Sequence, residues 1–167
     1  MITPTVVTQY LQELSQLMLS VEVTDIDGKD IGLDEGTEIA IQMMLDARSA
    51  SRKMLLTGNG GSAAIVSHVQ NDLCKAGGIR AMVLTEQPLL TALANDDGYG
   101  SVFERPVELW ADSGDLLLTV SSSGQSENIL RGARASAERG CKMITLSGFK
   151  PDNPLRLMGD LNFYVKS

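Results

Sequence analysis

The chain has 167 residues, of which 43% are hydrophobic, and this size and composition fit one domain with one sizeable core. Its 21 acidic residues outnumber 14 basic ones and give a net charge of −7, which argues against nucleic acid or an anionic membrane as a partner. No apolar run is long enough to cross a bilayer and the start lacks signal-peptide features, so we expect a soluble, cytoplasmic protein.

Two amphipathic helices are predicted near the N-terminus. Residues 5–19 place apolar side chains at three- and four-residue steps, the period of a helix with one apolar face. Residues 21–36 are polar and do not match the spacing of a calcium loop, so we expect a solvated loop. A second helix is predicted over 35–51, with an apolar surface broad enough to contact both a sheet and another subunit.

From residue 53 onward, short apolar runs alternate with helical segments. Apolar strands joined by helices indicate a parallel sheet covered on both faces. We therefore predict one α/β domain over 1–167: helices over 1–51 that support oligomerisation, then a core over 52–167 that is a flavodoxin-like, doubly wound, three-layer sandwich with an open sheet of about five parallel strands. The strands are expected at 54–57, 81–85, 116–120, 143–146 and 161–165, and the helices at 62–76, 88–95 and 125–139.

A glycine-rich turn follows the first of these core strands. Gly58, Asn59, Gly60 and Gly61 let the backbone approach a ligand closely, and Ser62 is placed to cap the next helix and to donate a hydrogen bond. Such turns also occur as plain strand-to-helix geometry. The turn lacks the spacing of a dinucleotide or nucleotide-triphosphate loop, so no nucleotide cofactor is expected.

A serine-rich turn follows the strand at 116–120. Its four hydroxyls, within six residues at a helix start, form a neutral nest suited to a dianion; they belong to Ser121, Ser122, Ser123 and Ser126. A serine-rich turn can also serve only to cap a helix. Because two such loops lie at the same edge of one sheet, a phosphate site is the favoured interpretation.

Four ordered motifs together resemble the sugar isomerase (SIS) domain, and within it the phosphoheptose isomerase branch. The motifs are residues 58–62, Asn95 with Asp96, residues 121–126 and residues 144–148. The resemblance covers about residues 5–167. It implies that the serine-rich loop binds the phosphate of a sugar and that Asn59, Gly60, Gly61, Ser62, Asn95 and Asp96 hold the sugar. It also implies homo-oligomers, tetramers or dimers, with active sites at subunit interfaces.

His68 and Asp72 are the candidate catalytic and metal-binding pair. They lie four residues apart on one helix and so share a face, although a structural histidine with an acidic surface partner gives the same pattern. The resemblance implies roles in proton transfer and in binding Zn²⁺ or another divalent metal, with a glutamate where this chain has the shorter Asp72. The family adds a glutamine and a histidine from a helix after the last strand. Because a buried strand at 161–165 ends the chain without a helix to cover the neighbouring sheet face, we expect that a C-terminal helix is lacking through truncation or that a partner supplies the cover.

The resemblance implies a ketose–aldose isomerase. Its substrate would be sedoheptulose 7-phosphate and its product D-glycero-D-manno-heptose 7-phosphate, a lipopolysaccharide precursor, formed through an enediol. Two alternatives stay open: a noncatalytic scaffold like the replication-initiator-associating branch, and a phosphosugar sensor that regulates a protein partner.

Overall fold

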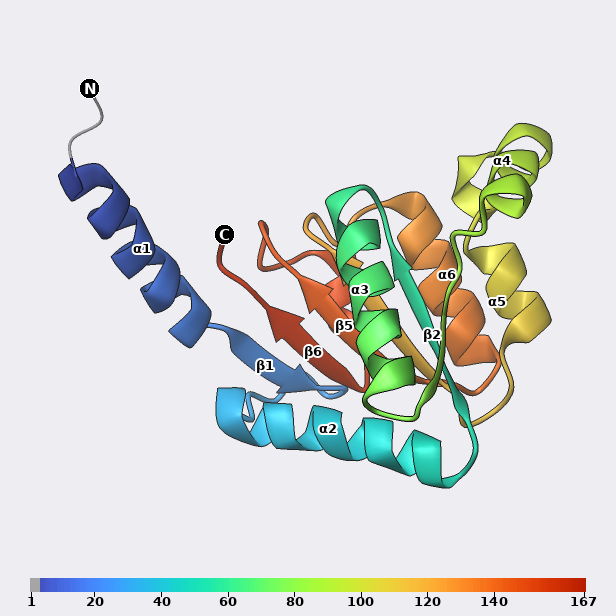
Figure 1. The fold of residues 1–167 in the computed structure, drawn as a ribbon, viewed down its shortest axis with the longest axis horizontal. Coiled ribbons are helices and arrows are strands. Elements are labelled where there is room, and N and C mark those ends of the chain that lie inside the picture. The colour runs from blue at the N-terminus through green and yellow to red at the C-terminus, as the bar shows by residue number, and fades with distance from the viewer. Residues whose placement is uncertain (1–3) are drawn as a thin grey trace.

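The structure, a computed structural model, describes residues 4–167 and consists of one sheet between two layers of helices (Figure 1). The sheet has six strands in the order β1-β6-β5-β4-β2-β3. The strands are β1 (Glu22–Asp25), β2 (Lys53–Gly58), β3 (Arg80–Val83), β4 (Leu116–Ser121), β5 (Lys142–Ser147) and β6 (Leu161–Tyr164). The helices are α1 (Pro4–Leu19), α2 (Leu33–Ser49), α3 (Gly61–Lys75), α4 (Gln87–Asp96), α5 (Glu104–Trp110) and α6 (Glu127–Glu138), with short 3₁₀ turns η1 (Tyr99–Ser101) and η2 (Pro154–Leu157).

The predicted α/β fold is confirmed, with two corrections. Strands β2 to β6 are parallel, as expected, but β1 adds a sixth strand that runs antiparallel to β6. The segment 21–36 is therefore not simply a solvated loop: it contains β1 and the first turn of α2. Helix α5 was also not predicted.

Alternation along the strands builds one apolar core on each face of the sheet. Leu55 and Leu117 are buried on the face covered by α5 and α6. Met54, Leu56 and Leu116 are buried on the other face, which α2 and α3 cover. Because both faces are covered, the strands are apolar along most of their length.

The two N-terminal helices differ in their relation to the sheet. Helix α1 projects away from the rest of the molecule (Figure 1), and its apolar side chains, including Tyr10 and Leu11, are exposed. Helix α2 lies on the sheet, where Gly36 packs so closely on Val23 that a Cβ would overlap that side chain. Since β1 lies between the two helices, the N-terminal segment also contributes a strand to the sheet.

Candidate functional site

The site lies where the strand order reverses. From β2 the chain passes to β3 on one side and then to β4 on the other side of β2. The loops after β2 and β4 therefore diverge at the carboxyl edge of the sheet, which is the place where open α/β sheets bind ligands.

A hollow of about 210 Å³ opens at this edge. Among the described residues that line it, none is ionisable, so a bound anion would be held by hydroxyls and backbone dipoles. The lining residues come from the loops after β2, β4 and β5, and they are Asn59, Ser62, Ser121, Ser122, Ser123, Ser126 and Phe149.

The serine-rich loop has the hydrogen bonding that an oxyanion requires. The hydroxyl oxygens of Ser121 and Ser123 each accept a hydrogen bond from a backbone N–H two or three residues later, at 3.2 Å in both cases. A hydroxyl that accepts in this way still has its own proton to donate. Ser126 is the N-cap of α6, yet its side chain makes no capping hydrogen bond. The first N–H groups of α6 also lack partners within the helix, so these amides and the serine hydroxyls are available to a bound anion.

The glycine-rich loop reaches the same hollow by a sharp turn. Gly60 has φ 53° and ψ −119°, a conformation open to glycine, and it is the N-cap of α3. Ser62 lies within the first turn of α3, which has no side-chain cap. The predicted capping role of Ser62 is therefore wrong, while its predicted place beside the ligand site is consistent with the lining of the hollow.

A pair of asparagines connects this loop to α6. Asn59 Nδ2 donates to Asn128 Oδ1 at 3.0 Å, and Asn128 Nδ2 donates to Asn59 Oδ1 at 2.9 Å. The Tyr99 hydroxyl donates to Asn59 Oδ1 as well, at 3.2 Å. Neither Asn128 nor Tyr99 was predicted, because only the folded chain brings together residues so far apart in the sequence.

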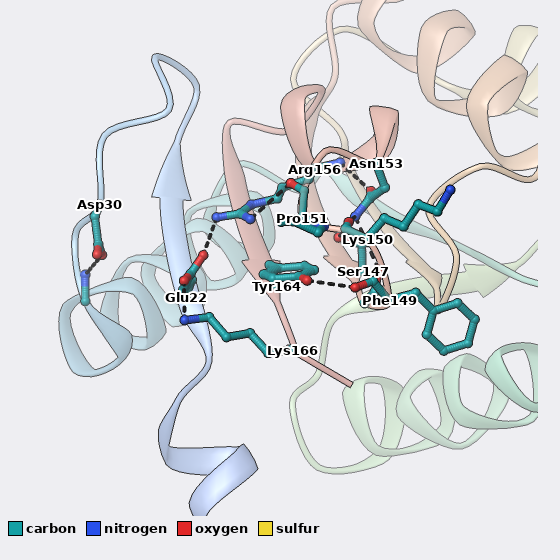
Figure 2. Close-up of polar contacts among 12 residues, drawn as sticks. Glu22, Asp30, Ser147, Phe149, Lys150, Pro151, Asn153, Arg156, Tyr164 and Lys166 are labelled. Carbon is teal, nitrogen blue, oxygen red and sulfur yellow. Dashed lines mark hydrogen bonds and ion pairs between the residues drawn. The ribbon is translucent and has the colours of Figure 1, made fainter.

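The loop after β5 braces the serine-rich loop from the other side. Gly148 N–H donates to the Ser122 carbonyl at 3.0 Å. The buried Asn153 donates to Ser147 Oγ at 3.1 Å and to the Lys150 carbonyl at 2.8 Å (Figure 2). Its polar atoms thus fix the path of residues 147–150. The sequence offered no signal for this role.

Six predicted site residues do not line the hollow. His68 and Asp72 lie on α3 with Nε2 and Oδ2 3.5 Å apart, and their side chains are 77% and 63% exposed. Asn95 donates to Asp96 at 2.7 Å at the exposed end of α4. Gly60 and Gly61 shape the loop beside the hollow without lining it. One copy of the chain therefore brings the predicted phosphate-binding serines together and leaves the predicted catalytic pair, His68 and Asp72, outside the hollow.

The donor set does not complete a zinc site within residues 4–167. Catalytic zinc has three protein ligands and an open position. No group of three histidine, cysteine, aspartate or glutamate side chains that could hold a metal occurs among the described residues. His68 and Asp72 supply two donors, which is one short.

The sequence profile of the SIS domain matches residues 9–148, and the chain belongs to this family. Its curated relatives include two phosphoheptose isomerases, each 36% identical to this chain. The one from Aliarcobacter butzleri aligns over 81% of this chain and 74% of its own length. The one from Geobacter sulfurreducens aligns over 75% and 69%.

Solved structures of phosphoheptose isomerases have the same fold. The structure from Francisella tularensis superimposes with a TM-score of 0.83 at 25% identity, covering 100% of this chain and 87% of that one. The structure from Neisseria gonorrhoeae gives 0.78 at 29% identity, covering 92% and 78%. Within residues 4–167, no helix is both long and apolar enough to span a bilayer.

Proposed function

We propose that this chain is a phosphoheptose isomerase that interconverts sedoheptulose 7-phosphate and D-glycero-D-manno-heptose 7-phosphate in the cytoplasm, for lipopolysaccharide precursor synthesis. The observation that carries the proposal is the serine-rich hollow at the strand reversal, in a chain whose relatives are phosphoheptose isomerases. The phosphate binds Ser121, Ser122, Ser123 and Ser126, and the carbon chain extends toward Asn59 and Ser62.

The neutral lining suits recognition of a phosphate on a sugar. Charge-assisted hydrogen bonds from hydroxyls and amides are stronger than neutral ones, and the N-terminus of α6 adds a favourable dipole. A sugar without phosphate would make none of these hydrogen bonds to the serine-rich loop. In a bound phosphosugar, the sugar end is held by weaker, neutral contacts, so most of the binding energy comes from the phosphate.

The reaction moves one proton between adjacent carbons. A base removes a proton from the hydroxymethyl carbon while the ketone oxygen takes up a proton, which gives an enediol. The carbon-bound proton then returns to the former carbonyl carbon as the hydroxyl proton on the neighbouring carbon leaves, which gives the aldose. We assign the base role to Asp72 with His68 as its neighbour. Because both side chains are exposed and lie outside the hollow, we propose that they act on a sugar bound by another copy in a dimer or tetramer. The exposed apolar face of α1 supports such an assembly.

The turnover assay supplies sedoheptulose 7-phosphate, with and without added zinc, and follows aldose formation. Asp72→Asn removes the base, and we expect it to lower kcat by at least about 100-fold, the usual contribution of a general base. Asp72→Glu restores the longer side chain of the family and is expected to keep activity. Glu38→Gln, an exposed acid on α2, is the matched control and should turn over like the wild type. Absence of aldose under all conditions, or full activity of Asp72→Asn, would contradict the proposal.

A second candidate function is phosphosugar binding without turnover, as a sensor or a scaffold for a protein partner. The observation that favours it is the separation of His68 and Asp72 from the hollow in one copy of the chain. Binding of sedoheptulose 7-phosphate with no aldose formed by the assembled protein would support this function over the isomerase.

A further inference from the structure

Among the described residues that line the hollow, Phe149 is the one with an apolar side chain. The other lining residues are an asparagine and serines, whereas Phe149 presents a large ring that is 57% exposed. The ring belongs to neither apolar core of the described chain. Exposing so much apolar surface is unfavourable in water, so the ring contributes little to the stability of the fold.

The backbone at Phe149 is strained. Within residues 4–167, only Phe149, at φ 58°, and Ser51, at φ 56°, are non-glycine residues with positive φ. Ser51 has a local cause, because it directly follows Ala50, the C-cap of α2, and the next N–H, that of Arg52, donates to the Ala47 carbonyl at 2.8 Å. Phe149 follows a strand, where no helix end requires this conformation. A bulky residue in this conformation points to a role for the side chain.

Several contacts hold the strained residue in place. The Tyr164 hydroxyl donates to the Phe149 carbonyl at 2.8 Å, and the Arg156 guanidinium lies 4.3 Å from the centre of the Tyr164 ring. The Asn153 amide fixes the carbonyls on either side, at Gly148 and Lys150. Figure 2 shows the Phe149 ring projecting away from this polar network, while its backbone carbonyl points into it.

The position of the ring relative to the other loops indicates its use. Strand β4 lies between β5 and β2, so Phe149 and Asn59 flank the serine-rich loop on opposite sides. If the serine-rich loop holds the phosphate, the sugar lies between the polar side chain of Asn59 and the apolar ring of Phe149. Ligand pockets combine apolar and aromatic surface with a few orienting polar groups in this way.

We propose that Phe149 is a substrate-binding residue whose ring packs against the carbon chain of the phosphosugar. This inference rests on the proposed function and adds a residue to its site. The polar network fixes the backbone of Phe149 before the ligand arrives, so little backbone entropy is lost on binding. The ring therefore discriminates a sugar phosphate from a bare phosphate, which reaches only the serine-rich loop.

The test measures the affinities of sedoheptulose 7-phosphate and inorganic phosphate by calorimetry, using the full chain. Phe149→Gly removes the ring and relieves the backbone strain. We expect it to weaken sugar phosphate binding about tenfold, in line with the loss of an aromatic contact, and to leave phosphate affinity within twofold. Ser51→Gly relieves the same strain at α2 and should change neither affinity. Phe149→Leu, which keeps apolar bulk, should lose less than Phe149→Gly.

The deciding quantity is the ratio of the two affinities. A fall in this ratio of fivefold or more in Phe149→Gly supports the proposal, whether or not the variant's melting temperature changes. A smaller fall would overturn the proposal. An equal loss of affinity for both ligands leaves the ratio unchanged, and would mean that Phe149 affects binding only by shaping the serine-rich loop. The wild type tests the proposed function separately. If it binds sedoheptulose 7-phosphate but forms no aldose, the isomerase function is refuted, while the role of Phe149 is still decided by the ratio of affinities.

Discussion

Asn59 and Asn128 bond to each other in both directions, each amide nitrogen donating to the other amide oxygen at 3.0 and 2.9 Å. One residue comes from the loop after β2 and the other from the first turn of α6. The pair thus ties the loop after β2 to the start of α6, beside the hollow. Asn128 is only 3% exposed, so its amide has no ready replacement by water.

Asn128→Ala is expected to lower the free energy of unfolding by about 1–3 kcal/mol, because the partner amide loses its hydrogen bonds. Urea unfolding measures this change. The control is Gln42→Ala, which breaks an exposed side-chain hydrogen bond to Asp46 within α2 and should cost less than about 0.5 kcal/mol. Equal stability of the two variants would show that the Asn59–Asn128 pair does not hold the loops together.

A second prediction concerns the close contact between Gly124 and Asn153. A Cβ on Gly124 would overlap the Asn153 amide, and Gly124 also has φ 58°. We expect Gly124→Ala to lower the free energy of unfolding by about 2–5 kcal/mol, from overpacking together with left-handed strain. Gly28→Ala shares the positive φ, at 77°, but meets nothing within 4 Å, and should cost only about 1–2 kcal/mol. A difference of less than about 0.5 kcal/mol between these variants would contradict the packing argument.

Most of the core could be predicted from the sequence because its signals are local. The five parallel strands are apolar runs, and the serine-rich hollow follows from hydroxyls close together in sequence. Strand β1 was missed because Glu22–Asp25 is short and partly polar, and only its pairing with β6 makes it a strand. Asn128 and Asn153 were missed because their roles arise from contacts between separate loops.

The carboxylate of Glu22 gives a prediction for pH. Hydrogen bonds from Lys166 and then Arg156, each at 2.6 Å, lower the pKa of Glu22 below its ordinary value of 4.5 (Figure 2). The stabilisation is therefore complete above pH 4.5 and is lost as the pH falls through the lowered folded pKa.

Glu22→Gln should flatten this part of the stability profile. Urea midpoints measured above and below pH 4.5 give the comparison, because the wild type has this acid-sensitive contribution and the variant lacks it. Glu38→Gln, at an exposed position of α2, is the control and should keep the wild-type slope. A profile of Glu22→Gln that parallels the wild type would show that the ion pairs of Glu22 with Arg156 and Lys166 do not stabilise the fold.

The exposed face of α1 predicts association. Leu11 and Leu14 are 57% and 41% exposed on a helix that projects from the fold (Figure 1). We expect sedimentation to show an oligomer for the wild type, and Leu11→Glu with Leu14→Glu to shift it toward the mass of one chain while the α/β core stays folded. Gln16→Glu adds charge to α1 without removing apolar surface and should leave the assembly intact. Unchanged mass of the double variant would place the interface elsewhere.

The central claim is that the serine-rich loop holds the phosphate of a phosphosugar. Calorimetry with sedoheptulose 7-phosphate and with unphosphorylated sedoheptulose tests it most directly, with Ser123→Ala beside the wild type and Ser67→Ala, an exposed serine of α3, as the control. We predict that the wild type binds sedoheptulose 7-phosphate and does not bind sedoheptulose. The binding free energy of sedoheptulose 7-phosphate should weaken by about 1–3 kcal/mol in Ser123→Ala and stay unchanged in Ser67→Ala. Equal affinity for the two sugars, or no loss in Ser123→Ala, would contradict the claim.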